Sequence, residues 1–250
     1  MPLPHRSVTP DPPVEIAEGA SLFLDFDGTL VELAERPDGV RVGNRLRDLM
    51  RNLHDRLEGR LAIVSGRPAA QVRHLFGQPE FIVAGCHGLE FHYADGRTVL
   101  TARPPRLDDV VAAMRRFSRD WPGVLVEEKP LGAALHFRQD PAAGPASIAL
   151  ASSLAAEHEL VLQTGKMMIE VRAADGDKGT AIRALMADPP FAGTRPLFIG
   201  DDDTDEPGFA AAANMGGAGI VVGGGRSPSA RYRLTDVAAV LDWLDGIGRP

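Results

Sequence analysis

The fold is decided by the stretch LFLDFDGTL, residues 22–30, in which a short apolar run leads directly into two aspartates. An apolar run of this length beside turn residues is typical of a buried parallel strand, which we expect over residues 22–26. Such a strand would leave Asp25 and Asp27 at the carboxyl edge of a sheet. Two carboxylates are costly to bury there unless a cation or a proton lies between them. On this stretch alone, a turn cap by one aspartate with Gly28 at the bend is the alternative.

Similar apolar runs recur along the chain and alternate with helical patterns. We expect strands over 61–64, 81–84, 197–199 and 220–222, and helices over 46–57, from Pro68, and over 179–186, 206–213 and 237–244. Strands that alternate with helices predict an open α/β sheet, whose ligands usually bind at the carboxyl ends of the strands.

The middle of the chain breaks this alternation. Helical spacing over 107–117 is followed by paired strands over 124–129 and 133–138, then by a helix over 142–158 and a hairpin of 160–163 with 167–171. This order, αββαββ, predicts a small antiparallel sheet with helices on one face. We therefore divide the chain into a core of residues 21–102 and 176–250, an inserted cap domain of residues 103–175, and a disordered or loosely attached tail of residues 1–20.

The inserted strands alternate between apolar and polar residues, so one face of the small sheet is apolar and the other can form hydrogen bonds. The polar positions are Glu127 and Lys129 in the first strand, His136 and Arg138 in the second, and Lys166, Glu170 and Arg172 in the last. The pattern alone does not distinguish a solvated face from one that binds a polyol.

Two helix starts carry groups suited to an anion. Ser65, Gly66 and Arg67 follow the strand at 61–64, where a helix N-terminus would offer free N–H groups; a simple N-cap is the alternative. Lys178 lies at the start of another helix, where the helix dipole disfavours a cation. We therefore expect an anionic partner for this lysine, a phosphate and a carboxylate together.

The fourth polar segment is GDDDTDE, residues 200–206, which follows the strand at 197–199. It is not an EF-hand loop, because that loop needs glycine where Glu206 stands and glutamate where Ala212 stands. A solvated turn is the alternative for this segment. An acidic cluster beside a buried strand, on the sheet edge expected for Asp25 and Asp27, suits a hard, oxygen-ligated cation such as magnesium.

Composition excludes several classes of function. The 27 lysines and arginines against 34 aspartates and glutamates give a formal net charge of −7, which opposes nucleic-acid binding. No apolar run approaches the roughly 18–20 residues of a membrane helix. The proline-rich N-terminus does not resemble a signal peptide, so we expect a cytoplasmic protein. Cys86 is the only cysteine, which excludes an internal disulfide, and we interpret it as a buried structural residue rather than a nucleophile activated by His87.

Taken in order, the polar segments resemble those of the haloacid-dehalogenase-like phosphatases, and within them the trehalose-phosphate phosphatases. The general match rests on Asp25-x-Asp27-Gly28-Thr29, Ser65, Lys178 and Gly200-Asp201-Asp202. The closer match rests on Gly85-x-His87-Gly88-x-Glu90, Val126-Glu127-x-Lys129 with His136-x-Arg138, Gly165-Lys166 with Glu170-Val171-Arg172, and Thr204-Asp205-Glu206. The chain departs from the family pattern in two places: Phe137 replaces a frequent tyrosine, and Pro207-Gly208 replaces an acidic and apolar pair.

This resemblance implies a doubly wound, mostly parallel α/β core with an inserted α+β cap. It also implies Mg²⁺-dependent hydrolysis of trehalose 6-phosphate through an aspartyl-phosphate, with Asp25 as nucleophile and Asp27 as general acid and base. The implied metal site comprises Asp25, Asp27 through its backbone carbonyl, Asp201 and Asp202, with Asp205 in support. Ser65, Gly66 and Lys178 would hold the phosphate, and the sugar would contact Glu127, Lys129, His136, Arg138, Lys166 and Glu170 of the cap, with Arg67 and His87 of the core.

The expected partner is therefore a small sugar phosphate, with no nucleic acid and no membrane, and the protein is expected to be a monomer. Two other functions stay open at this point. One is another sugar phosphatase or a phosphomutase with the same core. The other is a catalytically silent sugar-phosphate sensor, against which the intact Asp25, Asp27, Lys178 and Asp201 argue.

Overall fold

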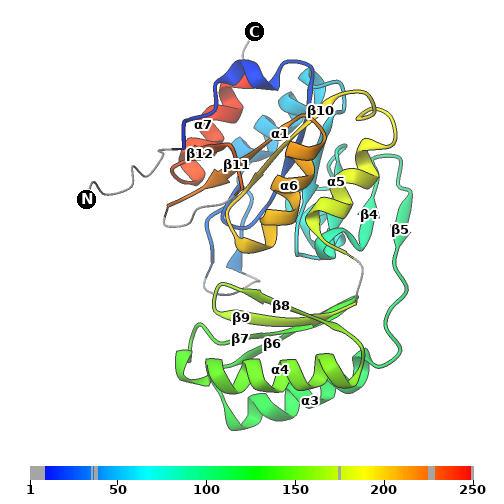
Figure 1. Cartoon of the computed structure of the whole chain (residues 1–250), viewed down its shortest axis with the longest axis vertical. Helices are drawn as coiled ribbons and strands as arrows, with labels where there is room; N and C mark the ends of the chain where they lie inside the picture. Colours follow the sequence, from blue (N-terminus) through cyan, green and yellow to red (C-terminus); the bar gives the residue numbers. More distant parts are fainter. Residues whose placement is uncertain (1–8, 35, 37–38, 174–175, 225–228, 249–250) are drawn as a thin grey trace, which may run out of the picture.

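The computed structural model describes residues 9–34, 36, 39–173, 176–224 and 229–248, and within them the strands form two separate sheets (Figure 1). The larger sheet has eight strands in the order β12-β11-β10-β1-β2-β3-β4-β5. Its strands run parallel from β12 to β3, whereas β4 and β5 are antiparallel. The bounds are β1 Ala20–Leu24, β2 Leu61–Val64, β3 Ile82–Gly85, β4 Glu90–His92, β5 Thr98–Leu100, β10 Arg195–Gly200, β11 Ala218–Val222 and β12 Tyr232–Leu234.

Helices cover both faces of this sheet because successive strand residues point to opposite sides. Leu22 and Leu24 of β1 pack in a cluster with side chains of α1 (Asn44–Arg56), α2 (Ala69–Phe76) and α7 (Val237–Gly248). Phe23 between them packs in a second cluster with α5 (Lys178–Met186) and α6 (Glu206–Asn214). The doubly wound α/β core predicted from the alternating pattern is confirmed.

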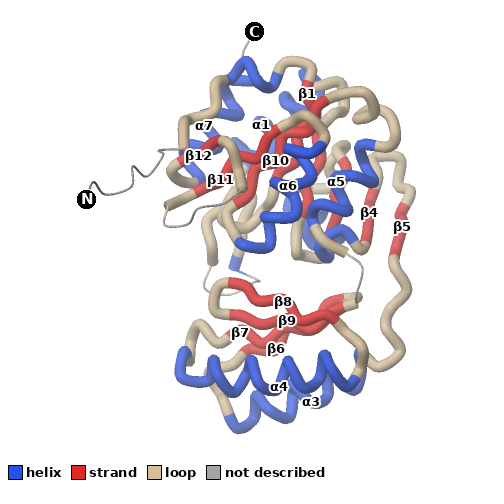
Figure 2. The backbone as a smooth tube through the Cα atoms, in the orientation of Figure 1, coloured by secondary structure: helices blue, strands red, loops and turns tan. Residues whose placement is uncertain are grey.

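The smaller sheet is antiparallel, with the order β6-β7-β9-β8. Its strands are β6 Leu125–Lys129, β7 Gly132–His136, β8 Val161–Gly165 and β9 Met168–Arg172, and its helices are α3 Leu107–Asp120 and α4 Gly144–Glu157. Figure 2 shows both helices on one face of this sheet and the core beyond its other face. The predicted order αββαββ is therefore present, as a cap over the core.

The alternation in the cap strands separates the two faces as predicted. Leu135, Ile169 and Val171 are fully buried against α3 and α4. On the other face the register aligns Glu127 of β6 with Ala134 of β7, Ala134 with Glu170 of β9, and Glu170 with Gln163 of β8. This row of residues faces the core, so the polar face is neither fully solvated nor part of the hydrophobic core.

The described part of the N-terminal segment is attached to the core, which corrects the expectation of a loose tail for residues 10–20. The backbone carbonyl of Pro10 accepts a hydrogen bond from the N–H of Arg233 at 3.0 Å, and that of Pro12 accepts one from Nε1 of Trp243 at 2.8 Å. Prolines lack an N–H but keep the carbonyl as an acceptor, which explains why a proline-rich segment can still be held in place. Residues 1–8 lie outside the described residues.

Three short strands, β4, β5 and β12, were not predicted. Each has only three residues, which is too short a run to indicate a strand in the sequence, and the apolar Val99 and Leu100 of β5 are exposed rather than part of the core. Among the described residues, no helix has the length and apolar character needed to cross a bilayer.

The departure at Pro207-Gly208 has a structural explanation. Pro207 lies in the first turn of α6, where its missing N–H costs nothing. A Cβ at Gly208 would overlap the ring of Phe198 on β10. The glycine therefore lets α6 approach the strand that ends at the acidic segment.

Candidate active site

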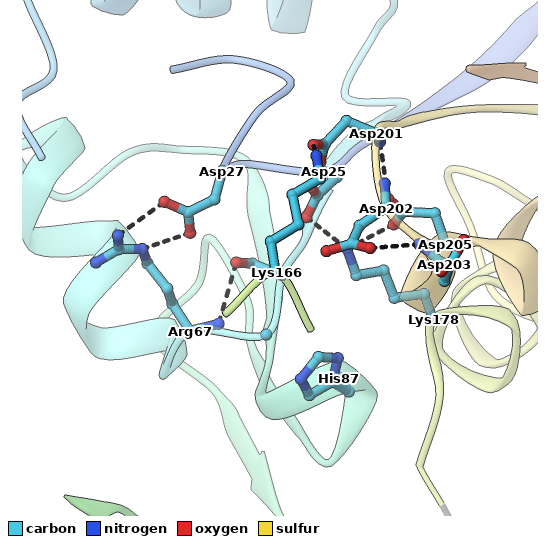
Figure 3. A network of polar contacts seen from close by, with 12 residues as sticks. Asp25, Asp27, Arg67, His87, Lys166, Lys178, Asp201, Asp202, Asp203 and Asp205 are labelled. Carbon is cyan, nitrogen blue, oxygen red and sulfur yellow. Dashed lines mark hydrogen bonds and ion pairs between the residues drawn. The ribbon is translucent and has the colours of Figure 1, made fainter. Parts of the chain in front are cut away.

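Three strand ends place their following residues at one edge of the larger sheet. Asp25 follows β1, Ser65 follows β2 and Asp201 follows β10. These strands are parallel neighbours, so their carboxyl ends lie together. Lys178, at the start of α5, reaches into the same group (Figure 3).

A capping box fixes the start of α5 and with it the position of Lys178. The N–H of Thr180 donates to Oδ1 of Asp177 at 2.6 Å, and the N–H of Asp177 donates to Oγ1 of Thr180 at 2.9 Å. Nζ of Lys178 then donates to Oδ1 of Asp25 and to Oδ1 of Asp205, each at 2.6 Å. Burial opposes the charge on this lysine, yet the two carboxylates outweigh burial and raise its pKa. The carboxylate partner predicted for Lys178 is therefore supplied by the protein.

Three acids form a group that could hold a cation. Asp25, Asp201 and Asp205 each offer a carboxylate oxygen, and these oxygens lie within 4.8 Å of one another. Burial raises the pKa of Asp25 well above its usual value, and the neighbouring acids add to the rise while Lys178 opposes it. Burial also raises the pKa of Asp201. A hard cation would stabilise the ionised form of both, and an all-oxygen donor set fits magnesium.

The roles within the acidic segment differ from one residue to the next. Oδ2 of Asp205 accepts the backbone N–H groups of Asp201 and Asp202 at 2.8 Å, so this acid holds the loop in shape. Asp202 directs Oδ1 to the N–H of Asp203 at 2.6 Å and so caps the following turn, and its place beside a metal stays a prediction. Asp201 fits closely against Gly28, whose φ of +80° suits glycine and where a Cβ would overlap the Asp201 carboxylate.

The loop after β2 brings together the residues predicted to hold phosphate. Oγ of Ser65, a residue only 1% exposed, accepts the backbone N–H of Arg67 at 3.1 Å. Gly66 lies against the ring of His87, with no room for a Cβ between them. The Arg67 side chain binds both carboxylate oxygens of Asp27, at 2.6 and 2.7 Å. Figure 3 shows Asp27 turned toward this guanidinium and away from the acidic cluster.

The side chains on the polar face of the cap are paired with one another. Glu127 contacts His136 with 2.8 Å between Oε2 and Nε2, and Nζ of Lys129 donates to Oε2 of Glu170 at 2.5 Å. Nζ of Lys129 also lies 3.3 Å from the carbonyl oxygen of Gly66, so it joins the cap to the loop after β2.

Two further cap residues contact the core directly. Nζ of Lys166, in the turn between β8 and β9, donates to Oδ2 of Asp201 at 2.6 Å. Arg138 donates from Nη1 to the carbonyl oxygen of Ala34 at 3.3 Å. The cap and the core are therefore in contact on both sides of the site.

Charges on the cap face stabilise one another. Burial opposes the ionisation of Glu170, but Lys129 and His87 outweigh burial and lower its pKa to about 2. Burial likewise opposes the charge on Lys129, which Glu170 and Glu127 more than offset, so its pKa is raised. His87 is different, because burial dominates and lowers its pKa. At neutral pH the face thus carries a buried ion pair beside a neutral histidine.

A cavity of about 190 Å³ lies between the acidic cluster and the cap. Every predicted site residue except Asp205 lines it: Asp25, Asp27, Ser65, Gly66, Arg67, His87, Glu127, Lys129, His136, Arg138, Lys166, Glu170, Lys178, Asp201 and Asp202. Asp205 is fully buried behind Lys178 and the loop that it holds.

Two polar residues of this region, Gln163 and Glu90, have contacts that sequence reasoning did not predict. Gln163 lines the cavity, and its Nε2 lies 3.2 Å from both ring nitrogens of His87 while Arg172 donates to its Oε1 at 2.6 Å. The cross-strand register of Gln163 with Glu170 could have found it, but that pairing is not visible in one strand alone. Glu90 accepts the backbone N–H of Ala69 and so caps α2, although we had assigned it no role.

Cys86 is a buried residue, as predicted, and burial raises the pKa of its thiol. It does not lie in an extended segment, because Cys86 and His87 have φ values of +48° and +58° in a tight turn. This turn aims the His87 ring at Gly66 and the cap.

Comparison with known proteins agrees with this geometry. The family model described as trehalose-phosphatase matches residues 23–238. The trehalose-6-phosphate phosphatase of Escherichia coli K12 is 34% identical over 235 residues, which cover 93% of this chain and 88% of that protein. A probable trehalose-phosphate phosphatase of Sinorhizobium fredii is 38% identical over 208 residues, covering 81% and 77%.

Solved structures support the fold. The C-terminal domain of Candida albicans trehalose-6-phosphate phosphatase superposes with a TM-score of 0.84 at 21% identity, over 97% of this chain and 99% of that one. A haloacid-dehalogenase-like hydrolase from Bacteroides thetaiotaomicron gives a TM-score of 0.65 at 15% identity, over 90% and 98%. With the family model matching most of its length, the chain belongs to the trehalose-phosphatase family.

Proposed function

We propose that this protein is a magnesium-dependent phosphatase that converts trehalose 6-phosphate to trehalose and inorganic phosphate. One observation carries the proposal: a single cavity joins the cluster of Asp25, Lys178 and Asp201 to the polar face of the cap. The cluster suits the phosphate end of such an ester, and the cap face suits the hydroxyl groups of a sugar.

In the proposed reaction the Asp25 carboxylate attacks phosphorus and the bond from phosphorus to the sugar oxygen breaks. Asp27, which enters this step in its protonated form, gives its proton to the departing oxygen, and an aspartyl-phosphate is left on Asp25. Asp27 then takes a proton from water as that water attacks phosphorus, and the bond to Asp25 breaks to release inorganic phosphate. The carboxyl group of Asp27 therefore acts first as an acid, in its protonated form, and then as a base, in its ionised form.

The remaining core residues would neutralise and hold the phosphate. Lys178 already lies 2.6 Å from Asp25 and would draw the anionic oxygens toward the nucleophile. Ser65 and the backbone of Gly66 would donate hydrogen bonds to the same oxygens. Bound at Asp25, Asp201 and the carbonyl of Asp27, magnesium would offset the negative charge that otherwise repels an anionic nucleophile.

The cap would select the sugar and exclude water. Glu127, Lys129, His136 and Glu170 place hydrogen-bond donors and acceptors on one face, which matches a ligand with many hydroxyl groups that both donate and accept. Contacts such as Lys166 with Asp201 hold the cap against the core, so bulk water would be displaced from the reacting atoms. The monomeric state and the cytoplasmic location stay predictions.

The test is phosphate release by the full chain from trehalose 6-phosphate, sucrose 6-phosphate and glucose 6-phosphate, each with and without magnesium. We expect the highest kcat/KM for trehalose 6-phosphate and loss of turnover after chelation. Preference for another ester would contradict the assignment of trehalose 6-phosphate as the substrate but would leave the proposed phosphatase mechanism intact. Phosphoryl transfer without net release would indicate a mutase, and tight binding without hydrolysis at saturating magnesium would indicate a sensor.

A further inference from the structure

The carboxylate of Asp27 is held by one side chain through both of its oxygens. Nε of Arg67 donates to Oδ2 at 2.6 Å and Nη2 donates to Oδ1 at 2.7 Å. Two parallel N–H···O bonds fix both the distance and the plane of a carboxylate, which a single ammonium group cannot do. The position of Asp27 is therefore set by the position of Arg67.

Arg67 is itself firmly placed. Its backbone N–H donates to Oγ of Ser65 at 3.1 Å, and its carbonyl accepts the N–H of Cys86 at 2.9 Å. Its guanidinium carbon lies 5.6 Å from the centre of the Phe26 ring. The Arg67 side chain is 10% exposed and that of Asp27 is 29% exposed, so the arginine is the anchored partner and the carboxylate is the one that faces the cavity.

These contacts connect the proposed acid to the loop that would hold the phosphate, because Arg67 follows Ser65 and Gly66 directly. Resting on the proposed function, we propose that Arg67 is a positioning residue for Asp27 rather than a ligand of the phosphate. When the protonated oxygen of Asp27 turns to the departing sugar oxygen, the remaining N–H···O bond can still hold the other oxygen of the carboxyl group. The guanidinium of Arg67 then binds both oxygens of Asp27 again for the second step, in which water attacks phosphorus.

The proposal makes a specific prediction about the leaving group. A sugar oxygen departs slowly unless it is protonated, whereas 4-nitrophenolate departs without a proton. An arginine that acts through Asp27 should therefore contribute far more to kcat/KM for a sugar phosphate than for 4-nitrophenyl phosphate. An arginine that binds phosphate matters equally for both, because the two esters share that group.

The experiment measures kcat/KM of the full chain with magnesium for trehalose 6-phosphate and 4-nitrophenyl phosphate. Because general acid catalysis typically contributes about 10²–10⁴-fold, we expect Arg67→Lys to lower the value for the sugar ester about 100-fold and the value for the aryl ester about tenfold or less. Asp27→Asn should show the same selectivity. The double variant should lie within about threefold of Asp27→Asn, because the arginine has no acid left to position.

Arg51→Lys is the matched control, since Arg51 pairs with Asp48 on the exposed face of α1 and should leave both values unchanged. Arg67→Gln is the second variant if Arg67→Lys is poorly folded, and the ratio of the two kcat/KM values does not depend on the folded fraction. Equal losses on both esters, or multiplied losses in the double variant, would overturn the positioning role. If the unmodified protein hydrolyses another sugar phosphate instead, that ester replaces trehalose 6-phosphate and the inference is still tested; hydrolysis of no ester would overturn both proposals.

Discussion

The two ends of the cavity are built in different ways. The core end gathers Asp25, Lys178 and Asp201 from segments far apart in the sequence, each placed by a strand end or a helix start. The cap end presents one face of a single small sheet, where Glu127 and Glu170 align in the same cross-strand row. The core end depends on long-range folding, and the cap end depends on strand alternation.

The difference has a functional consequence. At the core end, Lys178 lies between two buried carboxylates, and each charge is needed by the others. At the cap end, the pairs Glu127–His136 and Lys129–Glu170 are formed within the sheet. We therefore expect changes at the core end to lower turnover of every ester, and changes at the cap end to affect only those esters that carry the sugar.

The largest effect should come from Asp25→Asn. We expect turnover of both trehalose 6-phosphate and 4-nitrophenyl phosphate to fall by about 10⁴-fold or more, because the amide of asparagine is a far weaker nucleophile than the carboxylate that it replaces. The fold should remain, because Asp205 still pairs with Lys178 at 2.6 Å in the variant and an amide of equal size fills the same space. Phosphate release and thermal unfolding are measured side by side.

Asp242→Asn is the control for this variant, because Asp242 is 77% exposed and pairs only across the surface with Arg45. Turnover near the normal value in Asp25→Asn would show that Asp25 is not the nucleophile. A collapse of the melting temperature would show instead that its carboxylate is needed for folding.

A smaller and selective effect is expected at the cap from Glu127→Gln. Loss of a hydrogen bond to a charged group costs about 1.5–3 kcal/mol, so KM for trehalose 6-phosphate should rise about 10–100-fold. The value of kcat/KM for 4-nitrophenyl phosphate should change little, because that ester has no sugar to contact. Steady-state kinetics on both esters provide the measurement.

The neighbouring Glu128 provides a matched control. It lies on the opposite side of the same strand and pairs with Arg103 and Arg115 away from the cavity, so Glu128→Gln should leave both esters unaffected. An equal loss on both esters in Glu127→Gln would mean that the cap face serves the chemistry as well as the sugar.

At both ends of the cavity, the sequence predicts the features that depend on residues close together in the chain. The strand at 61–64 matches β2 residue for residue, and the cap faces follow from a period of two, because both are local properties of the chain. The predicted start of α5 was also close, since Asp177 and Thr180 form a local capping box.

Contacts between separate elements could not be predicted in the same way. The pairing of Arg67 with Asp27, of Lys166 with Asp201 and of Gln163 with His87 depends on how β1, β2 and the cap are placed relative to one another. Residue type shows that Arg67 is cationic, but only the folded chain shows that its guanidinium donates hydrogen bonds to both oxygens of Asp27. The sequence therefore predicted which residues gather, and the structure supplied their partners.

The smallest expected effect is on the pH dependence of stability. It comes from His87, which lies between the core end and the cap end of the cavity. Burial lowers the pKa of His87 in the folded protein, so the unfolded chain binds a proton at a higher pH than the folded chain does. Its contribution to stability is therefore constant above the unfolded pKa of about 6.5 and declines as the pH falls below that value. The charged groups around the ring are Glu170, Lys129 and Lys178.

Between pH 7.5 and pH 5.5 we expect the free energy of unfolding to fall by about 1 kcal/mol more in the unmodified protein than in His87→Asn, because asparagine does not titrate. Asparagine suits the site since it tolerates the φ of +58° at this position. Urea unfolding at the two pH values gives the difference, with the exposed His74→Asn as the control. A pH dependence that is the same in His87→Asn would mean that the ring gains its proton equally well in both states, so that burial between core and cap does not persist in solution.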